Sequence, residues 1–269
     1  MIPISTHFGE IPKSTYAGTR SRTWLEPDDR SNYQKQGNRA FGEGDVEYRF
    51  NSHGYRSAEF SERSELNILS IGCSYVFGTG LSVGTTFAEL LRRRLGEHVG
   101  KSVANWNLAL PGSSNDYISR LLLHAVPILR PDLVVVVFTH HARREYFDMN
   151  SRTYQHGPWV NPDMLDDRIA STIHRSLFQL ENPVEDLQNF YKNYTLAKMC
   201  VESHGIPWIY SYMDNEARHL RAVMDRDSFA GCVLEFADRA RDGVHPGLGS
   251  NDAFAKRLFA RLQARHLFG

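Results

Sequence analysis

Apolar segments and amphipathic segments alternate along the middle of this chain, and this alternation constrains the fold more than any other feature. The segments 66–72 (LNILSIG), 102–110 (SVANWNLAL) and 131–140 (PDLVVVVFTH) have the composition of buried strands. Helical patterns at 85–99 and 113–129 separate them. Continuous apolar strands between amphipathic helices indicate a parallel sheet that is covered on both faces. We therefore predict an α/β fold around a central parallel sheet.

The ends of the two helical segments carry recognisable signals. Thr85 or Thr86 stands where an N-cap would begin the first helix. Pro127 should end or kink the second helix, because proline lacks the backbone N–H that a helix interior uses. Three further elements are predicted downstream: a helix at about 185–204, a strand at 206–213 and a final helix at about 250–267.

Two segments lie outside this alternation. Residues 1–60 are mostly polar and irregular, with one short strand expected within 45–57, and we interpret them as an arm packed on one large domain of residues 61–269. Residues 141–184 carry aromatic residues among polar and proline residues. Long irregular insertions that follow a strand are usually functional or mobile, so we expect this one to border the site.

The charge balance excludes some classes of partner. The 269 residues contain 31 Lys and Arg and 31 Asp and Glu, so no net basic charge favours nucleic acid or a membrane surface. The longest strongly apolar run, at 133–138, is too short to span a bilayer, and the first residues lack a secretory pattern. The three cysteines lack metal-binding spacing. We expect a cytoplasmic protein with no nucleic-acid partner and no membrane span; its oligomeric state is not predicted.

The first predicted strand runs into a glycine-rich turn around Ser74. Such a turn lies at the carboxyl end of a strand, where open α/β sheets bind ligands. A phosphate loop would need a lysine after the glycines, and a dinucleotide loop would need glycines one residue closer together. The nucleophile elbow of α/β-hydrolases would need a glycine where Val76 stands. Two interpretations remain: a turn in which the serine caps a helix, and a nucleophile.

A loop near the end of the chain favours the nucleophile. A serine hydroxyl needs a general base, and that base needs a carboxylate to orient it. The loop DGVHPG at 242–247 supplies both in Asp242 and His245, three residues apart. The loop follows the last strand-like region, so we expect it on the same sheet edge as Ser74.

The order of three segments resembles the SGNH (GDSL-like) hydrolase family. They are GCSYVFG at 72–78, NLALPGSSN at 107–115 and DGVHP at 242–246. The resemblance covers about residues 66–265. Asn51, Gly54, Tyr55 and Arg56 also match an N-x-x-G-[YF]-R stretch that precedes the first strand in some members.

This resemblance implies a flavodoxin-like three-layer α/β/α sandwich and ester hydrolysis through an acyl-enzyme. The alternative is acyl transfer to a sugar or metabolite hydroxyl. The resemblance implies Ser74 as nucleophile, His245 as general base and Asp242 as the carboxylate that orients His245. The backbone N–H groups of Ser74 and Gly112 would form part of the oxyanion hole. The substrate would be a small-molecule or sugar ester, with no cofactor and no metal.

Two positions depart from the family pattern. Cys73 stands where an Asp usually precedes the serine, and we expect its side chain to pack inward. The usual third-block Asn, which donates to the oxyanion, has no counterpart in FTHHARRE at 138–145. His140 lies nearest to that position, and Thr139 or a backbone N–H are alternatives. The missing Asn also leaves open a non-catalytic binding module.

Arg56, Arg143 and Tyr146 are candidate substrate contacts. Arg143 would meet either a carboxylate of the protein or an anionic group of the substrate, and Arg56 is open to the same two interpretations. The neighbouring histidines and Glu145 lack the H-E-x-x-H spacing of zinc proteases, so no metal site is predicted.

Overall fold

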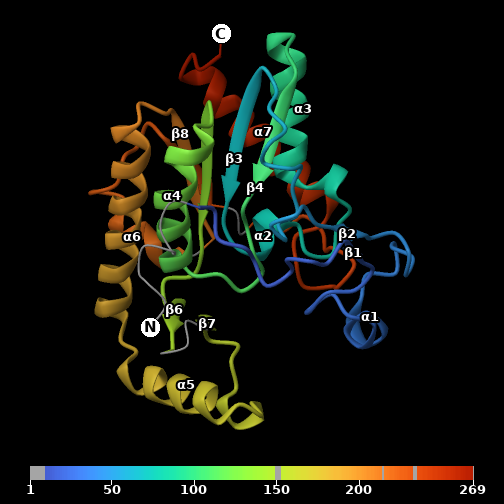
Figure 1. Cartoon of the computed structure of the whole chain (residues 1–269), viewed down its shortest axis with the longest axis vertical. Coiled ribbons are helices and arrows are strands. Elements are labelled where there is room, and N and C mark those ends of the chain that lie inside the picture. Colours follow the sequence, from blue (N-terminus) through green and yellow to red (C-terminus); the bar gives the residue numbers. More distant parts are fainter. Residues whose placement is uncertain (1–9, 149–152, 214, 233–234, 269) are drawn as a thin grey trace.

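A five-stranded parallel sheet forms the centre of the molecule, with the order β4-β3-β5-β8-β9 (Figure 1). The computed structural model describes residues 10–148, 153–213, 215–232 and 235–268. Along the chain, the five strands are β3 (Leu66–Ile71), β4 (Val103–Asn107), β5 (Leu133–Phe138), β8 (Trp208–Tyr212) and β9 (Phe229–Cys232). Numbered by position in the chain, this order is 2-1-3-4-5, a doubly wound sheet whose direction of winding reverses between β3 and β5.

Two helix layers cover the sheet (Figure 1). They consist of α3 (Phe87–Val99) with α7 (Leu248–Ala264), and α4 (Asn115–Leu129) with α6 (Pro183–Ser203). The central strand β5 serves both layers because its side chains alternate between the faces. Val134 and Val136 join the core under α4 and α6, whereas Val135 and Val137 join the core under α3 and α7. The predicted three-layer α/β/α sandwich is therefore confirmed.

The ends of α3 and α4 can be compared with the cap and proline signals in the sequence. Thr86 is the N-cap of α3, and its side chain accepts a hydrogen bond from the N–H of Glu89. The helix α4 passes through Pro127 and ends at Arg130, which adopts a left-handed backbone conformation with φ of 44°. The proline stands in the last turn, so the missing N–H interrupts only the end of the helix.

The N-terminal arm is mostly irregular, as predicted, but it contains one helix that the sequence did not indicate. The arm holds α1 (Arg30–Gln36) and two short antiparallel strands, β1 (Ser21–Arg22) and β2 (Tyr48–Arg49). The short strand expected within 45–57 is confirmed as β2. Only Tyr33 of α1 is buried, so no apolar periodicity marked this helix in the sequence.

The insertion at 141–184 is more regular than the sequence suggested. It contains the hairpin β6 (Arg144–Phe147) and β7 (Thr153–His156), the 3-10 turn η3 (Pro162–Met164) and α5 (Arg168–Leu180). The prediction of an irregular segment is wrong here: α5 carries Ile169, Ile173 and Leu177 four residues apart, which is a helical spacing. Part of this segment, 149–152, lies outside the described residues.

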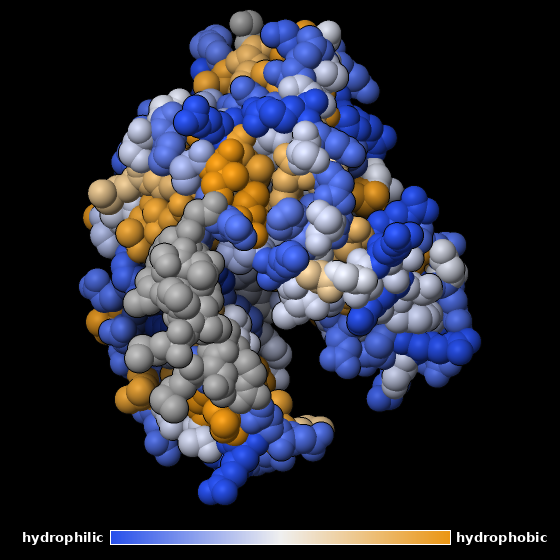
Figure 2. Space-filling view, in the orientation of Figure 1, coloured by the Kyte–Doolittle hydropathy of each residue, from blue (hydrophilic) through white to orange (hydrophobic). Residues whose placement is uncertain are grey.

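The carboxyl end of β3 points toward the end of the molecule that carries α5 and α1 (Figure 1). Figure 2 shows the surface indented between the part that carries α5 and the part that carries α1. The described elements also include the short helix α2 (Ser74–Phe77) and the 3-10 turns η2 (Val83–Thr85) and η4 (Asn215–Leu220). Among those elements, no helix combines the length and apolar character that crossing a bilayer requires.

Candidate active site

The turn after β3 presents Ser74 at the carboxyl edge of the sheet. Ser74 is the first residue of the short helix α2 (Ser74–Phe77), and Cys73 is its N-cap. A Cβ atom on Gly72 would lie 2.3 Å from Cγ2 of Val76 and 2.8 Å from the carbonyl oxygen of Val137. Only glycine therefore allows the chain to turn this tightly against β5. The turn leaves Ser74 6% exposed.

Asp242 and His245 form a buried hydrogen-bonded pair. Nδ1 of His245 lies 2.5 Å from Oδ2 of Asp242, and Oδ1 accepts the N–H groups of Val244 and His245, both at 3.0 Å. Burial alone would raise the pKa of Asp242, but the hydrogen bonds from the imidazole and the backbone outweigh it and lower that pKa. An ionised Asp242 fixes the Nδ1–H tautomer of His245, which leaves Nε2 as a proton acceptor.

The triad candidates lie on neighbouring loops. The ring of His245 packs edge-on against the ring of Tyr75, the residue after Ser74, with 5.6 Å between ring centres. Behind α2, the carbonyl oxygen of Gly80 accepts the N–H of Arg241 at 3.0 Å, which joins the two loops. Among the described residues, the one hydrogen-bond partner of the Ser74 hydroxyl is Sγ of Cys73, at 4.0 Å; the hydroxyl makes no hydrogen bond to His245. Catalytic hydrogen bonds are often long without substrate and shorten in the complex.

Cys73 packs inward, as the sequence predicted. Its side chain has no exposed surface, and its Sγ lies 3.4 Å from Sδ of Met213. A thiol enclosed in this way does not reach a substrate, so Ser74 is the nucleophile candidate of this turn.

The loop that carries Gly112 is tied to the Ser74 turn. The carbonyl oxygen of Gly72 accepts the hydroxyl of Ser113 at 2.9 Å and the N–H of Leu110 at 3.4 Å. Gly112 has a φ of 75°, in the left-handed region that favours glycine. Within the described chain, the N–H groups of Ser74 and Gly112 donate to no protein acceptor. Both donors are therefore available to an oxyanion.

The residues expected to replace the missing Asn are partly occupied. Thr139 is fully buried; its N–H donates to Oδ1 of Asn115 at 2.8 Å, and its hydroxyl lies 3.2 Å from Sδ of Met213. Nδ1 of His140 accepts the N–H of Ala142 at 3.2 Å. The use of His140 as an oxyanion donor stays a prediction. Asn115, the last residue of the segment at 107–115, ties the start of α4 to the end of β5.

The three predicted substrate contacts have different surroundings. Arg143 donates to the carbonyl oxygen of Ser113, next to Gly112. Tyr146 lies in β6 among charged groups of the insertion and of α4 and α6. Burial raises the pKa of Tyr146, and the nearest cation, Arg144, opposes that rise.

Arg56 has a structural role in place of the predicted ligand contact. Its side chain is 2% exposed. Its Nη1 and Nη2 donate to four backbone carbonyl oxygens, of Glu47, Phe77, Gly78 and Leu81. The guanidinium thus binds the arm to the segment that follows α2. Burial, which disfavours the charged form, lowers the pKa of Arg56 to about 10.

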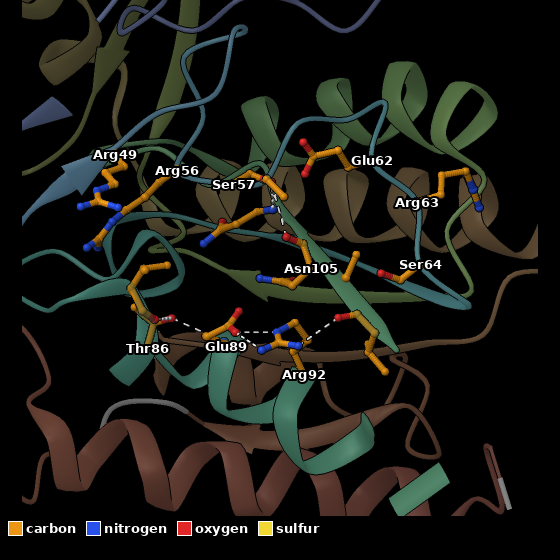
Figure 3. Close-up of a pocket in the computed structure, with 15 residues that line it drawn as sticks. Arg49, Arg56, Ser57, Glu62, Arg63, Ser64, Thr86, Glu89, Arg92 and Asn105 are labelled. Carbon is orange, nitrogen blue, oxygen red and sulfur yellow. Dashed lines mark hydrogen bonds and ion pairs between the residues drawn. The ribbon is translucent and has the colours of Figure 1, made fainter. Parts of the chain in front are cut away.

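A cavity of about 440 Å³ lies beside the edge strand β4, between the arm and α3 (Figure 3). It includes none of the triad candidates. Arg92, which lines it, is paired with Glu89 at 2.5 Å and donates to the carbonyl oxygen of Val103. The triad candidates therefore lie outside this cavity, at the Ser74 turn and the loop of Asp242 and His245. Within the described ranges, no group of three or more His, Cys, Asp or Glu side chains is arranged so that it could hold a metal ion.

No family model matches the sequence, and no curated protein matches it. Solved structures do resemble the fold. The esterase EstA from Pseudoalteromonas sp., inhibited by monoethylphosphonate, aligns with a TM-score of 0.50 and 10% identity over 75% of this chain and 99% of its own. TesA aligns with a TM-score of 0.49 and 13% identity over 74% of this chain and 98% of its own. A protein from Desulfitobacterium hafniense, described as lipolytic and of the G-D-S-L family, aligns with a TM-score of 0.43 and 13% identity over 74% of this chain and 100% of its own. The chain therefore shares its overall fold with the esterase EstA.

Proposed function

We propose that this chain is a serine-dependent hydrolase of carboxylic esters, with residues 61–269 as its catalytic domain. The buried Asp242–His245 pair carries the proposal, because it holds an imidazole against the residue that follows Ser74. The site lies at the switch point of the sheet, where open α/β folds bind ligands. The esterase name of one structure with this fold supports the same reaction class.

The mechanism uses the groups of this site in two steps. Oγ of Ser74 attacks the ester carbonyl carbon while Nε2 of His245 accepts its proton, and Asp242 stabilises the imidazolium. The N–H groups of Ser74 and Gly112 donate to the oxyanion. Collapse of this intermediate breaks the bond to the alcohol, which leaves with the proton from His245. Water then attacks the acyl-enzyme with His245 again as base, which releases the acid and restores Ser74.

Substitution of Ser74 tests the proposal directly. We expect Ser74→Ala to lower kcat on short-chain 4-nitrophenyl esters by at least about 10³-fold, because the variant has no nucleophile. Ser176→Ala, on the exposed face of α5, should retain wild-type turnover. An alkylphosphonate probe should label the wild type at Ser74, and circular dichroism would check that the variant is folded.

Three outcomes separate the alternatives. Unchanged turnover in Ser74→Ala would refute the nucleophile. A folded wild type that neither hydrolyses esters nor reacts with the phosphonate would be a binding module on this fold. Acyl release that requires a hydroxyl acceptor would identify a transferase; the insertion supports this alternative because Trp159 reaches the Gly112 side of the site, where it can restrict water.

A further inference from the structure

Arg143 differs from its neighbour in what it contacts. Its Nη1 donates to the carbonyl oxygen of Ser113 at 3.3 Å, and its Cζ lies 4.4 Å from the centre of the Trp159 ring. Arg144, the next residue, pairs with Asp186 at 2.5 Å. Arg143 makes no ion pair with any carboxylate in the described part of the chain. Its charge is therefore positioned by a carbonyl and a ring, neither of which neutralises it.

One donor of this guanidinium is buried without a partner. Nε of Arg143 has no hydrogen-bond acceptor among the described protein atoms. Arginine carries five N–H donors and stays charged over the pH range in which proteins fold. A buried donor that makes no hydrogen bond lowers the stability of the protein. An oxygen anion bound at Arg143 would balance its charge.

The position of Arg143 relates it to the reacting groups. The segment after β5 supplies Arg143, and the segment after the adjacent strand β3 supplies Ser74. The Trp159 ring under the guanidinium comes within 3.7 Å of the place where a Cβ on Gly112 would lie. Burial raises the pKa of Tyr75 to about 12, and the charge of Arg143 opposes that rise. The cation thus lies on the oxyanion side of the site, within electrostatic range of the residue after Ser74.

Building on the proposed ester hydrolysis, we propose that Arg143 and Trp159 form a subsite for an anionic group of the substrate, a carboxylate or a phosphate, beside the scissile ester. A guanidinium can bind either group through two parallel hydrogen bonds. The indole face keeps the guanidinium plane in place through a cation–π contact. The substrate class would then be a small ester that carries a negative charge.

Two esters that differ by one terminal carboxylate test this subsite. The pair is 4-nitrophenyl butyrate, which is neutral, and mono(4-nitrophenyl) glutarate, whose acyl chain ends in a carboxylate. We expect Arg143→Gln to lower the ratio of kcat/KM for the anionic ester to that for the neutral ester by about 10- to 100-fold, the range for loss of a hydrogen bond to a charged group. Arg143→Lys keeps the charge but loses the planar fork, so its ratio should lie between the wild type and Arg143→Gln.

A control and a third ester sharpen the result. Arg93→Gln removes an exposed arginine of α3 and should leave the ratio unchanged. The analogous ester whose acyl chain ends in a phosphonate distinguishes the two sources of charge, because the anion that the subsite prefers should show the larger loss. An equal loss for charged and neutral esters would overturn the proposal, since Arg143 would then act on the reacting carbonyl. An unchanged ratio would also overturn it.

Binding measurements separate this proposal from the hydrolase proposal. Calorimetry with glutarate and with propylphosphonate needs no turnover. Binding to the wild type that weakens at least tenfold in Arg143→Gln would support the subsite even if no ester were cleaved. Equal affinity in both proteins, or no binding of either anion to the wild type, would overturn it.

Discussion

The arm and the insertion both border the candidate site, but they are attached to the sheet in different ways. Arg241 and Asp28, which attach the arm, are fully buried, with 2.6 Å between Nη2 and Oδ2. Arg120 and Glu145, which attach the insertion, are 30% and 2% exposed. A buried ion pair tolerates the loss of one partner poorly, whereas exposure to water screens a charge left alone. The arm therefore belongs to the frame of the site, whereas water reaches one member of the ion pair that attaches the insertion.

The arm completes a ring of hydrogen bonds behind the triad candidates. Asp28 accepts the hydroxyl of Tyr48 at 2.5 Å, and that hydroxyl accepts the N–H of Gly80 at 2.8 Å. The carbonyl oxygen of Gly80 accepts the N–H of Arg241, whose guanidinium returns to Asp28. Gly80 follows the helix of Ser74, and Arg241 precedes Asp242. The ring thus links the loops that carry the two halves of the proposed triad.

The largest effect is expected from breaking this ring. Asp28→Ala would leave Arg241 buried without its carboxylate and should destabilise the protein by about 3–5 kcal/mol. Urea unfolding measures this loss, and esterase assays below the transition should show a lower kcat because the loops lose their alignment. Asp29→Ala is the matched control in the same arm. It removes only the N-cap of α1 and should cost about 1 kcal/mol. Equal losses in the two variants would contradict the role of the arm as a frame.

A smaller effect is expected from the insertion. Asp186→Asn removes the charge that pairs with Arg144, whose side chain is 13% exposed. We expect a loss of about 1–2 kcal/mol in urea unfolding, because an amide can still accept one hydrogen bond from the guanidinium. A loss as large as that of Asp28→Ala would show that the two regions are held alike.

The smallest effect is a dependence of the insertion on pH. Nδ1 of His156 lies 2.8 Å from Nδ1 of His174, and Nε2 of His156 lies 2.9 Å from Oε1 of Glu181. Burial and then the charge of His156 lower the pKa of His174 below its ordinary value of 6.5. The unfolded segment therefore takes up a proton more readily than the folded one. The stability of this packing is complete above about pH 6.5 and decreases as the pH falls through the lowered pKa.

Hydrogen exchange between pH 8 and pH 5 measures this dependence, after correction for intrinsic exchange rates. Amides of 153–180 should lose protection toward pH 5, whereas amides of the arm should not. His174→Gln should remove most of the difference between the two regions. Equal loss of protection in both regions would contradict the assignment to His174.

The sequence predicted the elements whose signals are local. The strand β5 consists of six consecutive apolar residues, and such a run is buried wherever the sheet places it. The pair of Asp242 and His245 lies within one turn, so its hydrogen bond depends on few other residues. The strand β9 was missed because it has only four residues, including a glycine. It also lies at the edge of the sheet, where a strand has one neighbour and needs no long apolar run.

The interactions that define the walls of the site join residues distant in the sequence. Arg56 was interpreted as a possible ligand contact, yet its acceptors include carbonyl oxygens more than twenty residues away. The periodicity of the chain does not indicate which arginine forms an ion pair with a carboxylate and which packs on an aromatic ring. Arg143 and Arg144 are neighbours with opposite outcomes, and only the packing of the insertion distinguishes them.

The ring that contains Asp28 and Arg241 has a consequence for the order of folding. Its ion pair closes a loop of 213 residues, far longer than any that joins neighbouring strands of the sheet. Contacts between distant residues form slowly, because the entropy of loop closure is lost before the contact compensates for it. The arm should therefore dock only after the sandwich has assembled. A refolding chain would regain its helices and sheet first, and the alignment of the loops that carry Ser74 and His245 last.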